Sequence, residues 1–414
     1  MPAKNQIRPY DIVLYGATGF VGQQTVAYFA QHAKGVTWAI AGRNRSKLEQ
    51  VLRDCKVRVP IIVADAQDAA ALSALAASTR VVLSSAGPFA LYGALLLAAC
   101  VQQRTHYADI TGESPWVREM IDAHHAQAAS DGTRIVPGCG FDSVPSDIGA
   151  YLVAQEMQRR HGASCVDVKA CFSMRGSFNG GTLASVLNMM EKGQKEMFSR
   201  PFLLNPERTP SAADAAHQDP VAPHRDADFD AWVGPFFMGP INTRVVRRSA
   251  ALQQAVGDKS YGSDFHYQEY LRFGKGGAAA VVAAGMSAGS MVTQAALQFA
   301  PIRSMTQMLA PKPGEGPSEK SMDGGSFRCL LVGKSARGDL VRATVSDQGD
   351  PGNRATTKMV CQAALALALD TDKLPGGKQR GGVITPAHAL GHVMVQRMRA
   401  AGMRVAIDSA GAAD

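Results

Sequence analysis

Hydrophobic and polar positions follow two alternating patterns through the first 150 residues. Short runs rich in β-branched residues, typical of strands, are each followed by a longer stretch whose apolar residues have helical spacing. The predicted strands cover 10–15, 36–41, 60–64, 80–85, 105–111 and 134–137. The predicted helices cover 23–32, 69–77, 92–103 and 114–130, and another begins at Ser46. This alternation predicts an α/β fold with a Rossmann-type, doubly wound parallel sheet.

The alternation ends after Tyr151, which predicts a second domain of mixed α+β structure. The expected elements are a strand at 165–174, a helix at 182–199, a Pro/Ala/Asp-rich loop at 205–230 and a closing helix at 386–401 that Thr385 would cap. The expected division is a Rossmann domain at 1–150, a second domain at 151–378 and a C-terminal helix at 379–414.

One segment of the second domain, 276–302, carries no charged residue. Its length would span a bilayer. Its glycines and hydroxyl side chains make it only weakly apolar, so a transmembrane helix is not the preferred interpretation. The alternatives are a buried helix with small-residue contacts, the wall of a hydrophobic substrate site, or a surface that contacts lipid.

Composition narrows the class of protein. The 414 residues are 46% hydrophobic and 19% charged, which is typical of a folded soluble protein of two or three domains. Seven scattered cysteines without a C-x-x-C pair argue against a zinc site or a disulfide framework, and no metal is expected. The N-terminus has no apolar signal core, so we expect a cytoplasmic protein, with peripheral contact at the inner face of the membrane as an alternative.

The net charge of +8 suggests an anionic partner. Because the basic residues are dispersed among acidic ones, nucleic-acid binding is not expected. An anionic cofactor, an acyl carrier or a membrane surface contacted through 276–302 explains the charge better, and a homodimer is a further expected assembly.

A glycine-rich turn joins the first predicted strand to the first helix. It comprises Gly16, Ala17, Thr18, Gly19, Phe20, Val21 and Gly22. Glycines there allow the backbone to approach a pyrophosphate, while the new helix directs its free N–H groups and positive end at the phosphates. The spacing Gly-x-x-Gly-x-x-Gly in this context predicts dinucleotide binding.

The residues that follow the second predicted strand distinguish an NAD site from an NADP site. An NAD enzyme would carry an acid there for the ribose 2′-hydroxyl, but this chain carries Arg43, Asn44, Arg45 and Lys47. Arg43 suits a 2′-phosphate, with Asn44 and Lys47 beside it, so NADP(H) is the predicted cofactor. The alternative is that these cations form a solvated first helical turn. Asp65 would either meet the adenine amino group or cap the following helix.

Four motifs together resemble one family. They are Gly-Ala-Thr-Gly-Phe-Val-Gly at 16–22, Ser-Ala-Gly-Pro-Phe at 85–89, His-Tyr-Ala-Asp-Ile-Thr-Gly-Glu at 106–113 and Gly-Phe-Asp-Ser-Val-Pro-Ser-Asp at 140–147. They are similar to motifs of the saccharopine-dehydrogenase-like oxidoreductases, in the branch of the trans-acting enoyl reductases. Weaker likeness continues in Gly314-Glu-Gly-Pro317 and Gly382-Val-Ile-Thr-Pro386.

The resemblance implies an NADP-dependent oxidoreductase with an NADP-binding Rossmann domain at 1–150, a substrate and dimerisation domain at 151–378, and a C-terminal helix at 379–414 that returns to the first domain. The turn at 16–22 would hold the pyrophosphate. Arg43 would bind the 2′-phosphate. The nicotinamide side would be formed by Ser85, Ala86, Gly87, Pro88 and Phe89. The turn at 140–145 would lie near hydride transfer, although Ser143-Val144 replaces the Pro-Gly of saccharopine reductase and Asp147 replaces its histidine.

We therefore expect an enzyme that adds hydride to an activated double bond of a lipid-like or polyketide-like acyl substrate, free or bound to a carrier. A donor must then protonate the adjacent carbon, and Asp142 is preferred over Tyr107 and Ser143. Asp109 and Glu113 are weaker candidates. One alternative is a saccharopine-type amino-acid dehydrogenase, for which Arg175 and Arg244 would face the nicotinamide. Another is a non-catalytic NADP-binding protein at lipid surfaces.

Overall fold

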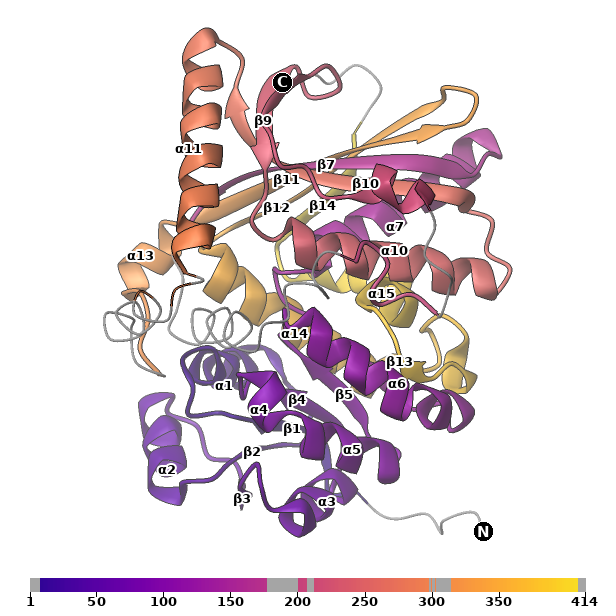
Figure 1. Ribbon diagram of the computed structural model, residues 1–414. Coiled ribbons are helices and arrows are strands. Elements are labelled where there is room, and N and C mark those ends of the chain that lie inside the picture. Colours follow the sequence, from indigo (N-terminus) through magenta and orange to yellow (C-terminus); the bar gives the residue numbers. More distant parts are fainter. Residues whose placement is uncertain are drawn as a thin grey trace.

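Two seven-stranded sheets organise the computed structural model, which describes residues 8–176, 200–206, 212–297, 299, 302 and 314–408 (Figure 1). The first sheet has the order β13-β6-β5-β4-β1-β2-β3, and all its neighbours are parallel. Its strands are β1 (Tyr10–Tyr15), β2 (Trp38–Gly42), β3 (Ile61–Val63), β4 (Thr79–Ser84), β5 (His106–Asp109), β6 (Arg134–Val136) and β13 (Gly382–Val383). This order confirms the Rossmann-type sheet and places its switch point between β1 and β4.

The helices of the first sheet follow the predicted alternation. They are α1 (Phe20–His32), α2 (Arg45–Asp54), α3 (Ala69–Ala77), α4 (Phe89–Tyr92), α5 (Ala94–Gln102) and α6 (Ser114–Ser130). Helix α5 confirms the helix predicted over 92–103, whereas the short helix α4 before Gly93 was not predicted. The first backbone N–H groups of α4 donate to Glu113, which is remote in sequence. Gly93 itself packs on Trp116, whose ring would lie 2.7 Å from an added Cβ.

The second sheet is mixed, with the order β14-β12-β11-β7-β10-β9-β8, and only its β10–β7 pair is parallel. Its strands are β7 (Cys165–Arg175), β8 (His224–Asp226), β9 (Ala231–Pro235), β10 (Tyr261–Gly274), β11 (Ser326–Ser335), β12 (Leu340–Gln348) and β14 (Arg404–Ile407). The expected mixed second unit is therefore confirmed. The helix predicted at 182–199 lies outside the described residues.

The loop expected over 205–230 is only partly a loop. It includes a 3₁₀ helix, Ala212–His217, and the edge strand β8. Strand β8 is short and polar, so it carries no hydrophobic alternation that a sequence pattern could reveal. It is fixed instead by tertiary contacts, because Lys169 of β7 donates to both Asp226 and Asp228 at 2.8 Å.

A layer of helices lies between the two sheets (Figure 1). Its members are α7 (Val144–His161), α10 (Gly239–Ala255), α14 (Thr356–Leu369) and α15 (Pro386–Ala400). Helix α7 packs on the second sheet, α14 packs on the first, and both contact α15. One hydrophobic core cluster consequently extends from Leu14 in β1 to Leu331 in β11. Because α7 runs across residue 150, the division into 1–150, 151–378 and 379–414 stays a prediction.

The C-terminal segment contributes to both sheets. Strand β13 extends the first sheet beside β6, and β14 pairs with β12 of the second. The sequence pattern missed β13, since two residues are too few to show a period. Arg134 fixes this region by donating to the carbonyl oxygens of Pro375, Gly377 and Ala389. The remaining short elements are α13 (Glu319–Asp323), η2 (Pro351–Ala355) and η3 (Gly377–Gln379).

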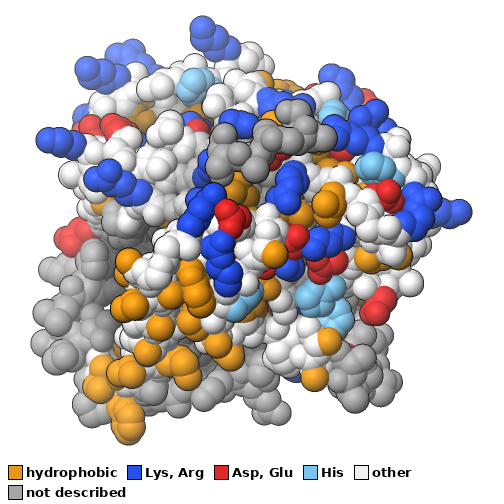
Figure 2. All heavy atoms as spheres, turned by 90° about the horizontal axis from the view of Figure 1, so that it is seen from above, with side chains coloured by type: hydrophobic (Ala, Val, Ile, Leu, Met, Phe, Trp, Pro, Cys, Tyr) orange, Lys and Arg blue, Asp and Glu red, His pale blue; other side chains and the backbone are white. Residues whose placement is uncertain are grey.

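The uncharged segment forms helix α11 (Gly277–Ala296), which extends along the side of the second sheet (Figure 1). It rests on β9 and β10 and buries Ala283 and Ser287 there. Its large apolar side chains, including Val281 and Val292, are mostly exposed. Seen from above, hydrophobic side chains gather on the side where α11 lies (Figure 2). The alternative of a buried helix is therefore wrong. Among the described helices, none combines the length and apolar character that crossing a bilayer requires.

Candidate functional site

The glycine turn lies at the switch point of the first sheet and closes tightly on itself. Gly16 has a φ of +83°, and an added Cβ would lie 2.8 Å from the backbone nitrogen of Ala86. At Gly22 an added Cβ would lie 2.2 Å from the carbonyl oxygen of Gly16. Helix α1 then begins without a side-chain cap at Gly19. The uncapped N-terminus beside a bare backbone fits a pyrophosphate.

Cations gather at the carboxyl end of β2, one strand from the glycine turn. Arg43, Arg45 and Lys47 are exposed, and none of them pairs with a carboxylate within the described part of the chain. Asn44 caps helix α2, because its Oδ1 accepts from the backbone N–H of Lys47 at 3.0 Å. Unpaired cations at this strand end fit the 2′-phosphate of NADP.

Asp65 follows β3 and does not cap the next helix. Its Oδ1 accepts from the backbone N–H of Gln67 at 2.9 Å, whereas Asp68 caps α3 through the N–H of Ala71. The capping alternative for Asp65 is therefore wrong, since the N-cap residue of α3 is Asp68, three residues later. Its contact with adenine stays a prediction.

The turn at 85–89 connects the glycine turn to the second half of the site. Ser85 Oγ donates to the carbonyl oxygens of Tyr15 and Gly16, at 3.3 and 3.2 Å. Ala86 packs against Gly16, and the Gly87–Pro88 peptide bond is cis. The end of β4 is thereby fixed against the end of β1, where a nicotinamide ring would lie in this fold.

Gly316 adds a contact that the sequence pattern did not assign to the cofactor site. It packs against the ring of Phe20, whose atoms would lie 2.6 Å from an added Cβ. The segment from Gly314 to Pro317 therefore lies on the first residue of α1. The signal that could have placed it was present in the resemblance, which includes Gly314-Glu-Gly-Pro317.

Tyr107 and Asp109 form a closed network at the end of β5. The Tyr107 hydroxyl donates to Asp109 at 2.9 Å, and the other carboxylate oxygen accepts from the backbone N–H groups of Thr111 and Gly138. Burial raises the pKa of Asp109 to about 7. Because Tyr107 is fully buried and committed to Asp109, this arrangement positions the loops after β5 and β6 and does not present the phenol to a substrate.

Asp142 has a different environment. Among the described residues, no group donates a hydrogen bond to its carboxylate, and burial raises its pKa to about 6. One carboxylate oxygen would lie 3.5 Å from a Cβ at Gly112, beside Ile241. A carboxyl group with this pKa and no internal partner is suited to proton transfer near neutral pH.

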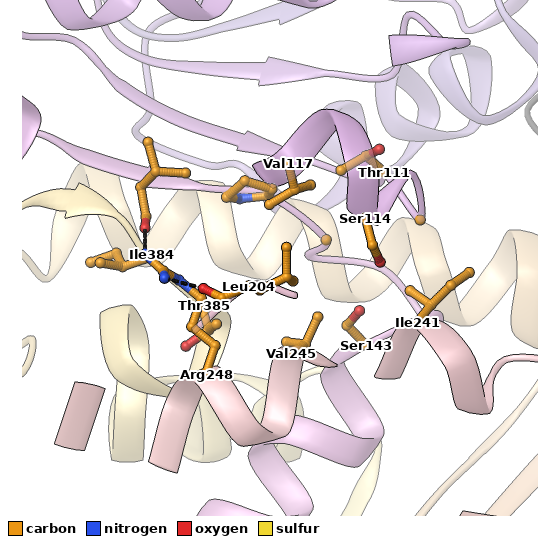
Figure 3. A pocket seen from close by; sticks show the side chains of 14 residues that line it. Thr111, Ser114, Val117, Ser143, Leu204, Ile241, Val245, Arg248, Ile384 and Thr385 are labelled. Carbon is orange, nitrogen blue, oxygen red and sulfur yellow. Dashed lines mark hydrogen bonds between the residues drawn. The ribbon is translucent and has the colours of Figure 1, made fainter. Parts of the chain in front are cut away.

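Ser143, the residue after Asp142, lines a small cavity (Figure 3). The cavity lies at the carboxyl ends of β5, β6 and β13, and its walls include Ser114, Leu204, Ile241, Val245 and Arg248. Its volume of about 20 Å³ accommodates one water-sized group and no acyl chain. Ser114 was not singled out in the sequence, since a serine at a helix start is typical of an ordinary cap.

The cations expected for an amino-acid substrate lie elsewhere. Arg244 is buried and pairs with Asp219, and Arg175 is exposed at the end of β7. Neither lines the cavity, whereas Arg248 does. Arg248 donates to the carbonyl oxygens of Leu204 and Val383.

Comparisons with known proteins show the family of the chain. Residues 12–136 match the family model of the saccharopine dehydrogenase NADP binding domain. A trans-acting enoyl reductase of Mycobacterium tuberculosis is 36% identical, with 96% of this chain and 97% of its own length covered. A trans-acting enoyl reductase of Mycobacterium ulcerans is 35% identical over the same shares.

The fold has a solved counterpart. The apo saccharopine dehydrogenase (L-Glu forming) of Saccharomyces cerevisiae aligns with a TM-score of 0.51 at 12% identity, over 96% of this chain and 99% of that one. Fold and site thus define an NADP-dependent oxidoreductase of the saccharopine dehydrogenase-like class. Within that class, the chain belongs to the family of the trans-acting enoyl reductases.

Proposed function

We propose that this protein reduces the activated double bond of a carrier-bound enoyl thioester with NADPH. The observation that carries the proposal is the half-buried carboxyl of Asp142, to which no described residue donates a hydrogen bond and which lies beside the loop that supports the nicotinamide side of the crevice. The printed names of its relatives, trans-acting enoyl reductases, support the same reaction class. A lipid-like or polyketide-like acyl chain is the proposed substrate.

The cofactor residues contact three parts of the dinucleotide. The turn at 16–22 and the N-terminus of α1 hold the pyrophosphate, and Arg43 with Lys47 holds the 2′-phosphate. The turn at 85–89 supports the nicotinamide, and Glu113 holds that turn in place. Bound NADPH supplies the hydride that adds to the β-carbon of the substrate.

Asp142 supplies the proton for the α-carbon. Its raised pKa keeps a useful fraction of the carboxyl protonated near pH 6, and no hydrogen bond from a described residue must break before the proton leaves. Tyr107 and Asp109 act as positioning residues, because their buried hydrogen bonds fix the loops that present Gly112 and Ser143.

Deuterated NADPH tests the reaction. Incubated with a trans-2-enoyl thioester on an acyl carrier protein, the enzyme should transfer one deuterium to the β-carbon, detected by mass spectrometry of the released acyl group. Solvent should provide the hydrogen at the α-carbon. Failure to reduce any enoyl thioester, combined with oxidation of saccharopine, would favour the amino-acid dehydrogenase instead.

The exposed apolar face of α11 supports a contact between the protein and a membrane. We infer that Val281, Val282, Met286 and Val292 lie against an anionic membrane surface, since they form an exposed apolar set on a protein of net charge +8. Contact at a membrane would bring the enzyme to lipid-like acyl chains. Assembly as a homodimer stays a prediction.

A further inference from the structure

We propose that the hydroxyl groups of Ser114 and Ser143 bind the thioester oxygen of the substrate and stabilise the negative charge that hydride addition places on it. This inference rests on the proposed function and specifies which atoms of the protein recognise the substrate. It assigns a role to a pair of side chains that the cofactor site does not use.

The two hydroxyls are buried without partners. Ser114 is 2% exposed and Ser143 is 1% exposed, and neither Oγ has a hydrogen-bond partner in the described part of the chain. They come from different helices and point toward one another across the cavity (Figure 3). Most buried hydroxyls in proteins are paired, so two unpaired ones that share a cavity indicate an acceptor that is supplied from outside the chain.

The walls of the cavity favour an oxygen that carries negative charge. The N-termini of α6, α7 and α15 meet there, through Ser114, Ser143 and Thr385. Each helix has a proline within its first two positions. The N-cap residues of α6 and α7 make no side-chain cap, whereas the carboxylate of Asp147 accepts from the backbone N–H of Ala387 in α15 at 2.7 Å. The positive ends of α6 and α7 stabilise an anion placed between them.

Arg248 adds positive charge to the same wall. It is 2% exposed and lies beside the carbonyl oxygens of Leu204 and Val383. No carboxylate pairs with it among the described residues, and burial lowers its pKa to about 9. A developing oxyanion in the cavity would compensate this buried charge.

The chemistry of enoyl reduction requires such a site. When hydride adds to the β-carbon, the electron pair of the C=C bond forms a new double bond between the α-carbon and the carbonyl carbon. The electron pair of the C=O bond then moves to oxygen and gives an enolate. Two hydroxyl donors at that oxygen stabilise the enolate. When Asp142 gives its proton to the α-carbon, the C=O bond forms again and the saturated thioester results.

The spacing of the residues suits this sequence. Asp142 directly precedes Ser143, so the proton donor and one oxygen ligand lie next to each other in the chain. The α-carbon is two bonds from the thioester oxygen. The cavity admits a single oxygen-sized group, which matches a carbonyl oxygen and leaves the acyl chain outside.

A binding experiment separates recognition of the oxygen from catalysis. The probes are trans-2-dodecenoyl-pantetheine, a thioester, and the matching dodec-2-enyl thioether, which lacks the carbonyl oxygen. Affinities are measured by calorimetry with NADP⁺ present, which cannot donate hydride. Wild-type protein should bind the thioester at least tenfold more tightly. Ser114→Ala and Ser143→Ala should each reduce that preference, and the double variant should bind both probes equally.

Kinetics and stability complete the test. Each single variant should lower kcat with NADPH by about 100-fold and change KM less, because the contact is strongest when charge develops. The control Ser130→Ala, at the exposed end of α6, should match wild type. Melting temperatures of the cavity variants should not fall, since neither hydroxyl makes an internal hydrogen bond.

The outcomes distinguish the proposed role of the two serines from the proposed enoyl reduction. Equal affinity of wild type for thioester and thioether, with normal turnover of the thioester, would overturn the serine assignment and leave enoyl reduction intact. Lower melting temperatures with an unchanged thioester preference would show that the serines hold a structural water. Binding of neither probe by wild-type protein would reject the proposed function together with this inference.

Discussion

The carboxylate of Glu113 accepts hydrogen bonds from the backbone N–H of Phe89, at 2.8 Å, and of the following residue, at 3.0 Å. This contact joins the loop after β5 to the turn after β4. Glu113 therefore holds the turn that we propose supports the nicotinamide. The next residue, Ser114, lines the cavity proposed for the substrate oxygen. The relationship gives a direct way to test whether the two halves of the site depend on each other.

Glu113→Ala should weaken both stability and cofactor binding. The substitution leaves two N–H groups without their acceptor, which costs about 1–3 kcal/mol for each one that remains buried. We expect a lower melting temperature and an NADPH affinity reduced by about tenfold, measured by thermal unfolding and fluorescence titration. Glu119→Ala, on the exposed face of the same helix, is the matched control. Unchanged NADPH affinity would show that the turn at 85–89 does not contact the cofactor.

Arg43→Ala should remove the preference for NADPH over NADH. The guanidinium pairs with the 2′-phosphate only in NADPH, and loss of a hydrogen bond to a charged group costs about 1.5–3 kcal/mol. Titration with both cofactors measures the ratio of the two affinities. Arg53→Ala, exposed near the end of the following helix α2, should preserve that ratio. An unaltered ratio in Arg43→Ala would mean that these cations form only a solvated helical turn.

Asp142→Asn should abolish reduction while NADPH still binds. In the wild type, the donor must be protonated, and burial raises the pKa of Asp142 to about 6. Activity should therefore decline as the pH rises through about 6. The pH dependence of kcat for an enoyl thioester, compared with NADPH affinity at each pH, separates proton transfer from binding. A flat profile between pH 5 and 8, at intact cofactor affinity, would assign the proton to another donor.

Glu269→Gln should change how stability depends on pH. Glu269 is buried and accepts hydrogen bonds from Ser146, Asn242 and Tyr267, and burial raises its pKa to about 7. Because the folded pKa lies above the ordinary value of 4.5, its contribution is complete below pH 4.5 and is lost as the pH rises through 7.

That loss amounts to about 3 kcal/mol in the free energy of unfolding. Denaturant unfolding at pH 5 and pH 8 should show a smaller difference for Glu269→Gln than for wild type. Asp264→Asn, exposed on the same strand, should behave as wild type. Identical pH profiles for all three proteins would contradict a carboxyl of raised pKa at this position.

Val281→Asp and Val292→Asp should weaken membrane contact without unfolding the protein. Their side chains are 73% and 69% exposed, so a charge there meets water in the free protein and hydrocarbon only at a membrane. Co-sedimentation with phosphatidylglycerol vesicles should fall, while melting temperature and NADPH affinity remain constant. Leu340→Asp, an exposed apolar position on β12, is the control. Equal vesicle binding by all variants would reject α11 as the contact surface.

Local sequence patterns predict most of the structure of the first 150 of the 414 residues. Each βα unit there is local: a short buried strand and an amphipathic helix follow from neighbouring residues, and α3 and α6 have the predicted bounds. The glycine turn could also be predicted from the sequence, because the backbone of this one turn leaves no space for a side chain at Gly16 or Gly22. The cations after β2 belong to the same local pattern.

Tertiary structure alone decided the parts whose partners are remote in sequence. Strand β13 is too short to show a period and forms because Arg134 and β6 lie beside it. Helix α11 contains no charge, which is compatible with core or surface, and only its position on β9 and β10 leaves it exposed. The placement of Ser114 and Ser143 on one cavity likewise depends on the tertiary structure. Residues 29 positions apart line the same cavity because the carboxyl ends of parallel strands meet at one edge of a sheet.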